Sequence, residues 1–324
     1  MSAADAPVTW GIIGAGGVAR RRMLPAVADH PRVRIGAVMV RSAERAAMLA
    51  AEFGALASYH RAEDLLADQA VEAVYIATPP DTHRELVEAA AAAGKHILLE
   101  KPMALSVEDA RAMESAAQRA GVLLSVCFPM RHTASLRQLK AWLDAGELGH
   151  CTYLRAQMAK WYPLDAALWR ADPAQSGGGV IMDLGSHLLD LAAWLLGPIE
   201  SVEARGASAA WPVAVEDSAV IVLRCESGAL GVLELSFAVA GNHSAVELYG
   251  TRGTARQVDS SLWRSTPTGV VQTTLAEDDV YRLELLDFQR ALRGGPPPAV
   301  SAADGVINTH WLHQAYRSLA RQST

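Results

Sequence analysis

Three side chains that could move a proton stand in two short segments of the chain. Lys101 follows Glu100 at the end of the run GKHILLEKP, and Asp183 and His187 stand in the later run GGGVIMDLGSHLLD. An imidazole titrates near neutral pH and suits general acid–base catalysis. A nearby ammonium group stabilises the negative charge on an oxygen that is losing its proton. Together these residue types indicate chemistry at a substrate hydroxyl or carbonyl group.

The spacing of these residues suggests how they cooperate. Asp183 and His187 stand four positions apart in an apolar stretch, 180–196, that reads as a helix, so both should lie on one helix face. The preceding glycines, Gly177–Gly179, allow the backbone to approach a ligand closely. We predict His187 as proton donor and acceptor, Lys101 as its electrostatic partner, and Asp183 as a ligand for a substrate hydroxyl.

Each of these residues also has a purely structural interpretation. His187 stands among leucines and could be a semi-buried histidine, Asp183 could be a helix-start carboxylate, and Lys101 a strand-end surface charge. Asp190 could serve only to orient the helix. The coincidence of the lysine, the aspartate and the histidine favours catalysis. Because no second cluster of ligands accompanies them, we predict no metal site.

A glycine-rich loop near the N-terminus indicates a nucleotide site. The run VTWGIIGAGGVARR places it between a strand-like and a helix-like stretch. The first glycine permits a tight turn, the second lets the backbone approach a pyrophosphate, and the helix N-terminus faces the phosphates. Because a βαβ unit surrounds the loop, we predict dinucleotide binding through Gly14, Gly16, Gly17, Val18 and Ala19.

The end of the second expected strand favours NADP over NAD. An acidic residue that binds the adenosine ribose is expected there, but the chain reads VMVRS, ending in Arg41 and Ser42. Arg41 and Ser42 could hold a 2′-phosphate through charge-assisted hydrogen bonds. The alternative is that Arg41 is exposed and Ser42 only caps the following helix, which would fit the use of both cofactors.

The composition narrows the class of protein. The chain has 324 residues, of which 51% are hydrophobic and 20% charged, which is typical of a globular protein with room for two domains. Its net charge of −6 argues against nucleic acid as a partner. The three cysteines are widely spaced, the first residues lack a signal segment, and no apolar run reaches the ~18 residues of a membrane span. We therefore expect a cytoplasmic protein that binds neither nucleic acid nor a membrane.

The pattern of apolar residues differs between the two parts of the chain. Up to about residue 127, apolar runs of strand length alternate with alanine-rich helical stretches, which predicts a parallel sheet covered on both faces. Beyond it, helix candidates precede alternating strands that indicate a mostly antiparallel, open sheet. We predict an α/β protein with a doubly wound Rossmann domain, residues 1–127, and an α+β domain, residues 128–324. The expected strands are 9–13, 33–40, 73–77, 96–100, 122–126, 218–225, 229–238, 244–249 and 254–258, and the expected helices are 19–29, 43–53, 83–93, 107–120, 135–145, 180–196, 280–293 and 303–320.

With these motifs in place, the chain resembles the family of glucose–fructose oxidoreductase, inositol dehydrogenase and rhizopine-catabolism proteins (Gfo/Idh/MocA). The similarity includes VYIATPPDTH, AGKHILLEKPMALS, WRADPAQSGGGVIMDLGSHLLDLAAWLLG, ESGALGVLELSFA and ELYGTRGTA, and so extends over nearly the whole chain. The resemblance implies a nicotinamide-dependent oxidoreductase with a Rossmann domain. It also implies a larger α/β domain whose open sheet face often serves oligomerisation, so we expect a homo-oligomer, either a dimer or a tetramer.

The resemblance also assigns roles to individual residues. It implies that Lys101, Asp183 and His187 are catalytic, and that the substrate lies between the nicotinamide and the helix that carries Asp183. Beyond the glycine loop, the cofactor contacts that it implies are Thr78, Pro79, His83, Glu100 and Lys101. The substrate contacts that it implies are Arg131, Trp169, Arg170, Asp183 and His187.

Departures from the family pattern bear on the substrate. Phe128 and Pro129 precede Arg131 and make the pocket wall more apolar, while Trp161 and Tyr162 suggest a stacking surface for a sugar ring. We expect a dehydrogenase or reductase that acts on the secondary alcohol or ketone of a sugar, polyol or related cyclic compound. Two alternatives stay open. A glycoside hydrolase with tightly bound NAD would release an aglycone without net cofactor change, and a non-catalytic nucleotide-sensing regulator would be expected to lose the lysine or the histidine.

Overall fold

The computed structural model describes residues 7–166, 168–259, 261–276 and 279–321, and the chain forms two compact units. Unit 1 comprises the residues up to Pro129 together with Asp279–Ile307, and unit 2 comprises residues 130–278 together with the residues from Asn308 onward. The sequence analysis divides the chain once, near residue 127, whereas the contacts add a later segment to unit 1. Residues 1–6, on which the expectation about a signal segment rests, lie outside the described residues.

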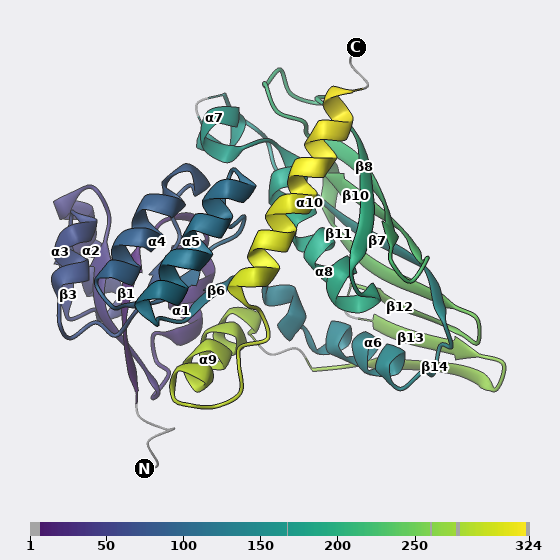
Figure 1. The fold of residues 1–324 in the computed structure, drawn as a ribbon, viewed down its shortest axis with the longest axis horizontal. Coiled ribbons are helices and arrows are strands. Elements are labelled where there is room, and N and C mark those ends of the chain that lie inside the picture. Colours follow the sequence, from purple (N-terminus) through teal and green to yellow (C-terminus); the bar gives the residue numbers. More distant parts are fainter. Residues whose placement is uncertain (1–6, 167, 260, 277–278, 322–324) are drawn as a thin grey trace. The chain divides into compact units, whose positions relative to one another are not determined.

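Unit 1 is built on a six-stranded sheet in the order β3-β2-β1-β4-β5-β6, with every neighbouring pair parallel (Figure 1). Its strands are β1 (Val8–Ile13), β2 (Val33–Met39), β3 (Ala57–Tyr59), β4 (Ala73–Ile76), β5 (His96–Leu99) and β6 (Leu124–Val126). Every residue of β1 and β4 is buried, because helices cover both faces of the sheet. The predicted doubly wound sheet is confirmed, and β3 is an edge strand that the sequence analysis missed.

Two separate apolar clusters cover the two faces of this sheet. On one face, Leu65, Val87 and Met113 pack from α3, α4 and α5. On the other, Leu49 and Phe288 pack from α2 and α9, and the Phe288 ring lies 5.5 Å from the ring of Trp10 on β1. The helical elements of unit 1 are η2 (Ala19–Met23), α1 (Leu24–Val27), α2 (Ala43–Phe53), α3 (Ala62–Ala67), η3 (Pro80–Thr82), α4 (His83–Ala92), α5 (Val107–Ala120) and α9 (Val280–Leu292).

Unit 2 is built on an eight-stranded sheet in the order β14-β13-β12-β11-β7-β10-β9-β8. Its strands are β7 (Cys151–Trp161), β8 (Ile199–Ala207), β9 (Ser218–Cys225), β10 (Leu230–Ser236), β11 (Ala238–Gly250), β12 (Thr254–Val258), β13 (Ser261–Thr266) and β14 (Gly269–Thr274). β10 pairs with β7 in parallel, and the other neighbours pair antiparallel. The sheet is therefore mostly antiparallel, as predicted.

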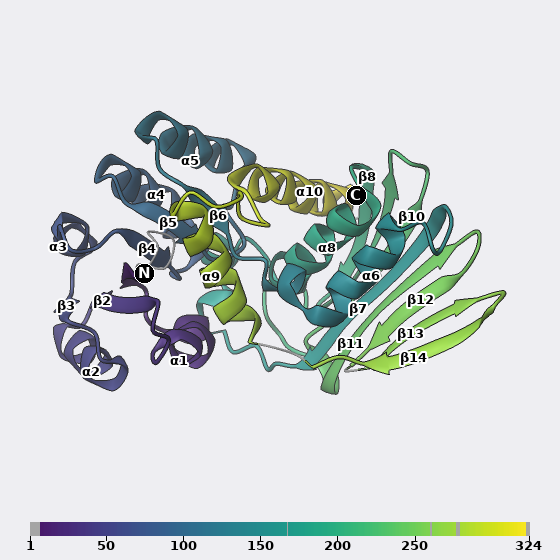
Figure 2. The same ribbon diagram turned by 90° about the horizontal axis from the view of Figure 1, so that it is seen from below.

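One face of the large sheet carries helices and the other is open. Figure 2 shows α6 and α8 lying along one face of the strands, where residues such as Leu139, Leu188 and Ile221 form the core of unit 2. Burial alternates along β9, and Val220 and Val222 on the opposite face are 42% and 48% exposed. The helical elements are η4 (Pro129–His132), α6 (Ala134–Asp144), η5 (Trp169–Ala171), α7 (Pro173–Ser176), η6 (Ile181–Gly185), α8 (Ser186–Leu196) and α10 (Ala302–Ala320), which begins in unit 1.

One helical stretch, Pro173–Leu196, is long and apolar enough by composition to cross a membrane. The sequence analysis expected no such stretch. However, 72% of its most apolar window is buried in the protein, which is the behaviour of a core helix.

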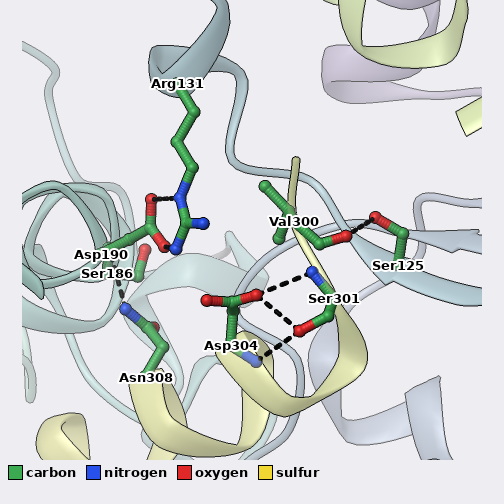
Figure 3. A network of polar contacts seen from close by, with 8 residues as sticks. All are labelled: Ser125, Arg131, Ser186, Asp190, Val300, Ser301, Asp304 and Asn308. Carbon is green, nitrogen blue, oxygen red and sulfur yellow. Dashed lines mark hydrogen bonds and ion pairs between the residues drawn. The ribbon is translucent and has the colours of Figure 1, made fainter. Parts of the chain in front are cut away.

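A buried ion pair anchors α8 to the segment that leads into α6. Arg131 donates from Nε and from one terminal nitrogen to the two carboxylate oxygens of Asp190, at 3.0 and 2.6 Å (Figure 3). The two side chains are only 8% and 2% exposed. In the same view, Asn308 donates from Nδ2 to the carbonyl oxygen of Ser186 at 2.8 Å, which ties α10 to the start of α8. The position of α8 thus depends on polar contacts as well as on its leucines.

Replacing Asp190 with Asn should destabilise the protein by about 3–5 kcal/mol, because it leaves the buried guanidinium of Arg131 without its balancing charge. Guanidinium chloride unfolding of the two proteins measures the change. Asp144→Asn is the matched control, since Asp144 pairs with Lys140 on an exposed face, where an ion pair contributes at most about 1 kcal/mol. Equal effects of the two substitutions would contradict the anchoring role of Asp190.

Candidate active site

The glycine loop of unit 1 has the geometry of a phosphate-binding turn. Gly14 has a φ of +85°, and a Cβ there would lie 2.7 Å from the Thr78 side chain and 2.8 Å from the Ala77 carbonyl. Only glycine fits such a position. A Cβ added at Gly17, which has a φ of +46°, would meet nothing within 4 Å. A Cβ added at Gly16 would meet only the guanidinium of Arg45, at 3.9 Å. The space beside the loop is therefore open to a ligand, and it has a cation at its rim.

The helix after this loop begins differently from the prediction. The sequence analysis expects one α-helix over 19–29, but the segment opens with the π-helical turn η2, Ala19–Met23, and continues as α1. The N–H of Arg20 donates to the carbonyl oxygen of Gly16 at 3.3 Å, so the helical bonding starts in the loop itself. Backbone N–H groups at such a start can bind an anion.

Arg41 and Ser42 stand at the end of β2, where the 2′-phosphate contact was predicted. Ser42 is the N-cap of α2, and its side chain accepts a hydrogen bond from the N–H of Arg45 at 3.3 Å. Its hydroxyl hydrogen can still be donated to another group. Arg41 and Arg45 are both exposed. The cap that the sequence analysis considered as an alternative is thus present, together with a second arginine that the sequence analysis did not single out.

His83 braces the backbone beside the glycine loop. Its ring is 1% exposed, with Nδ1 3.1 Å from the carbonyl oxygen of Met103 and Nε2 3.0 Å from that of Thr78. Burial lowers the pKa of His83, and the hydrogen bonds to backbone carbonyl groups oppose this shift. The Thr82 hydroxyl donates to the carbonyl oxygen of Pro79 at 2.8 Å. His83 is therefore placed to hold Thr78 and the segment after Lys101 in position.

Glu100 fixes the backbone at Lys101. Its carboxylate accepts a hydrogen bond from the Tyr75 hydroxyl at 2.5 Å and another from the N–H of Lys101 at 3.2 Å. Burial, and then the charge of Glu100, hold the pKa of Tyr75 well above its usual value. Burial, and then Glu284 and Glu100, do the same for the Cys127 thiol. Both groups remain protonated at neutral pH, so Tyr75 keeps the hydrogen that it donates to Glu100.

In unit 2, Asp183 and His187 lie on successive helical segments. Asp183 is in the π-helical turn η6 and His187 is in α8, where the sequence analysis expected one continuous α-helix over 180–196. π turns are rare and occur frequently at functional sites. Lys160, at the end of β7, places its Nζ 3.8 Å from Oδ2 of Asp183. The pairing of strands thus brings a lysine beside the predicted substrate-binding carboxylate.

The predicted aromatic residues and Arg170 also belong to unit 2, as do Lys160 and Asp183. The Arg170 guanidinium lies 4.4 Å from the centre of the Trp169 ring and 5.8 Å from that of Tyr162. The Trp161 ring packs instead against Trp211 at 5.4 Å and is 57% exposed. Arg131, a predicted substrate ligand, is in the buried ion pair with Asp190. Trp169, Arg170 and Tyr162 therefore lie together, while Arg131 has a structural contact of its own.

A carboxylate holds the start of the helix that carries Asp183. Glu216 accepts hydrogen bonds from the N–H of Gly179 at 3.1 Å, from the N–H of Ile181 at 3.0 Å and from the Tyr316 hydroxyl at 2.7 Å. Its own carbonyl oxygen accepts from the N–H of Val180 at 2.9 Å. A negative charge at a helix N-terminus is stabilising, so Glu216 fixes where η6 begins.

Comparison with known proteins identifies the family. Residues 8–128 match the oxidoreductase family with an NAD-binding Rossmann fold, and residues 136–256 match the GFO/IDH/MocA C-terminal domain. The chain is 32% identical over 308 residues to 1,5-anhydro-D-fructose reductase from Ensifer adhaerens, and the match covers 92% of each chain. The chain belongs to the Gfo/Idh/MocA family.

Other known proteins are similar to the chain over almost their full length. D-xylose 1-dehydrogenase (NADP(+)) 2 from Haloferax volcanii is 30% identical over 323 residues, which cover 95% of this chain and 96% of that one. The structure of an oxidoreductase from Agrobacterium radiobacter in complex with NAD+, L-tartaric acid and magnesium has a TM-score of 0.88 and 26% identity, covering 98% and 97% of the two chains. The resemblance stated from the motifs is confirmed.

The Gfo/Idh/MocA motifs fall into both units. The glycine loop, Thr78, Glu100 and Lys101 belong to unit 1, and Arg131, Trp169, Arg170, Asp183 and His187 belong to unit 2. Sequence reasoning missed Arg45, which lies near the glycine loop in unit 1, and Lys160 and Glu216, which lie near η6 in unit 2; none of the three stands in a motif. In the part of the chain that the structure describes, no group of three or more His, Cys, Asp or Glu residues could hold a metal ion.

Replacing Gly179 with Ala should abolish or nearly abolish activity, because the added Cβ would lie 1.9 Å from the carbonyl oxygen of Glu216. The helix start must then shift, and Asp183 shifts with it. Steady-state kinetics and thermal unfolding, measured together, check this. Gly228→Ala is the control: a Cβ there meets nothing within 4 Å, so this variant adds the same methyl group without a collision, although it carries the strain of a positive φ that Gly179 does not have. Similar activity in the two variants would refute the role of the Glu216 contact.

Proposed function

We propose that this protein is an NAD(P)-dependent dehydrogenase or reductase that transfers a hydride between nicotinamide and the secondary alcohol or ketone of a sugar, polyol or related cyclic compound. The observation that carries the proposal is that Lys101, Asp183 and His187 are all present, each on an element that other residues brace. Lys101 follows the Glu100 carboxylate that binds its N–H, and Asp183 follows the turn that Glu216 holds. The sugar reductase and sugar dehydrogenase among the relatives support the same class.

In this proposal, the residues of the chain handle the proton while the bound nicotinamide supplies or accepts the hydride. His187 removes the proton from the substrate hydroxyl in the oxidative direction and returns it to the carbonyl oxygen in the reductive direction. Lys101 stabilises the negative charge on that oxygen. Asp183 accepts a hydrogen bond from a substrate hydroxyl and so orients the ring. These roles require Lys101 and His187 to act on one substrate oxygen.

The cofactor proposal is NADP(H) in preference to NAD(H). The open space beside Gly16 and Gly17 fits a pyrophosphate, and Arg45 reaches its rim. Arg41 and Arg45 offer two cations to a 2′-phosphate, and the Ser42 hydroxyl offers a donor. The NADP-dependent relative from Haloferax volcanii supports this choice, whereas the similar oxidoreductase from Agrobacterium radiobacter is in complex with NAD+.

We propose a cytoplasmic homo-oligomer as the active form. The three cysteines are free thiols, and Cys127 and Cys225 are buried, as suits a reducing compartment. The open face of the eight-stranded sheet exposes Val220, Val222 and Leu230 by 42–48%, which suits a surface that a second copy covers.

The purified protein should change nicotinamide absorbance with NADP+ or NADPH and a member of a panel that includes D-xylose, inositols and 1,5-anhydro-D-fructose. Lys101→Met and His187→Ala should each lower kcat by about 10²–10⁴-fold with little change in nucleotide affinity, because they remove proton transfer or charge stabilisation and not the glycine loop. Lys140→Met, at a remote lysine, is the control. Near-normal kcat in both variants would overturn the catalytic roles of Lys101 and His187. Release of an aglycone without net change of the cofactor would instead identify the protein as a glycoside hydrolase.

Arg41→Ala should raise the KM for NADP(H) by about tenfold or more and leave the KM for NAD(H) nearly unchanged, because it removes a charge-assisted hydrogen bond to the 2′-phosphate. Arg45→Ala should raise the KM for both nucleotides, because Arg45 also lies at the rim of the pyrophosphate space, and more strongly for NADP(H). Initial rates with both nucleotides measure this. Arg61→Ala is the control, since Arg61 is exposed and pairs with Glu63. A wild-type protein that prefers NAD(H) by tenfold would rule out the NADP proposal.

A further inference from the structure

Lys160 and Asp183 form a pair of opposite charge that is open to solvent. Lys160 is the penultimate residue of β7, and its Nζ lies 3.8 Å from Oδ2 of Asp183 in the π turn η6. The side chain of Lys160 is 34% exposed and that of Asp183 is 21% exposed. A pair with this much exposure contributes at most about 1 kcal/mol to stability. Stability alone therefore gives little reason to hold a lysine here.

The position of the ammonium group is nevertheless well defined. Nζ of Lys160 lies 5.2 Å from the centre of the Tyr162 ring and 5.3 Å from that of Phe237. The two rings pack at 5.3 Å, and the N–H of Tyr162 donates to the carbonyl oxygen of Phe237 at 2.8 Å. Cation–π attraction to the two rings and the charge of the Asp183 carboxylate together restrict where the ammonium group can lie. A long, flexible side chain is thus oriented before any ligand binds.

The two groups have complementary hydrogen-bonding chemistry. An ammonium group only donates hydrogen bonds, and an ionised carboxylate only accepts them. A hydroxyl oxygen can serve both, and a carbonyl oxygen can only accept. Side by side, the lysine and the aspartate suit two neighbouring substrate oxygens, of which the one that faces Asp183 must be a hydroxyl.

We propose that Lys160 is a specificity-determining residue that donates a hydrogen bond to the substrate oxygen adjacent to the hydroxyl bound by Asp183. The site then selects substrates with two neighbouring oxygens, either a vicinal diol or an α-hydroxy ketone. This inference rests on the proposed oxidoreductase function and deepens it by naming the substrate pattern. A charge-assisted hydrogen bond of this kind makes a difference of about ten- to hundredfold in kcat/KM between a substrate with the oxygen and one without it.

The test uses the panel sugar or polyol that the wild-type protein turns over, together with its mono-deoxy derivatives, each of which lacks one hydroxyl. Wild-type protein should prefer the parent compound over one particular deoxy derivative by about ten- to hundredfold in kcat/KM. Lys160→Met keeps the length and the apolar contact with the rings but removes the donor, so this ratio should fall towards one. The ratios for the other deoxy derivatives should stay unchanged, and Lys160→Arg should restore part of the lost discrimination.

The possible outcomes distinguish failure of the specificity role of Lys160 from failure of the proposed oxidoreductase function. A purely structural role of Lys160 would lower activity for all compounds alike, so an unchanged set of ratios in Lys160→Met overturns the specificity role and leaves the proposed function standing. Lys140→Met serves as the control and should keep every ratio. If the Met variant does not fold, Lys160→Gln runs the same comparison with an uncharged side chain. No turnover of any parent compound by the wild-type protein with either nucleotide overturns the proposed function and this inference together.

Discussion

The Glu216 carboxylate determines where the helical stretch that carries Asp183 starts. It accepts hydrogen bonds from two backbone N–H groups of the helix start and from the Tyr316 hydroxyl. The approach is possible because residues 178 and 179 lack side chains; at Gly178 a Cβ would lie 1.9 Å from the Tyr316 hydroxyl oxygen. Burial, and then Glu216, hold the pKa of Tyr316 well above its usual value, so the phenol stays a donor. The placement of Asp183, two residues beyond Ile181, follows from this contact.

Elements with strong local signals could be predicted from the sequence. The strands Ser218–Cys225 and Thr254–Val258 were expected with their observed bounds, because the first is a mostly apolar run that ends at the ESGAL turn and the second begins directly after Gly253. β7, Cys151–Trp161, was missed, since arginine, glutamine and lysine alternate along it with small residues and weaken the apolar pattern. The π turns at Ala19 and Ile181 were also missed, because apolar periodicity marks a helix without telling an i→i+5 turn from an α turn.

In the candidate site too, residues that stand in short motifs could be predicted from the sequence, whereas residues that reach the site through tertiary contacts could not. Lys101, Asp183 and His187 came from short motifs with fixed spacing. Lys160 and Glu216 stand alone in the sequence and reach η6 only through strand pairing and a loop contact. The linear order also hid the membership of α9 in unit 1, where Phe288 packs against Trp10 across the length of the chain. Reasoning from local patterns finds the candidate catalytic residues more readily than the residues that position them.

Most of the predicted substrate contacts in unit 2 lie in one connection between two strands of the large sheet. Residues 162–198 connect β7, in the interior of the sheet, to β8 at its edge, and they include Tyr162, Trp169, Asp183 and His187. The register of both strands is fixed by their neighbours in the ladder and not by the length of this connection. Loops tolerate changes in length at small cost in free energy. Within the connection, however, α8 packs in the core of unit 2 and Glu216 binds the start of η6, so only the part before Gly179 can change without disturbing them. New substrate contacts can be engineered in that part while the sheet, α8 and the Glu216 contact remain as they are.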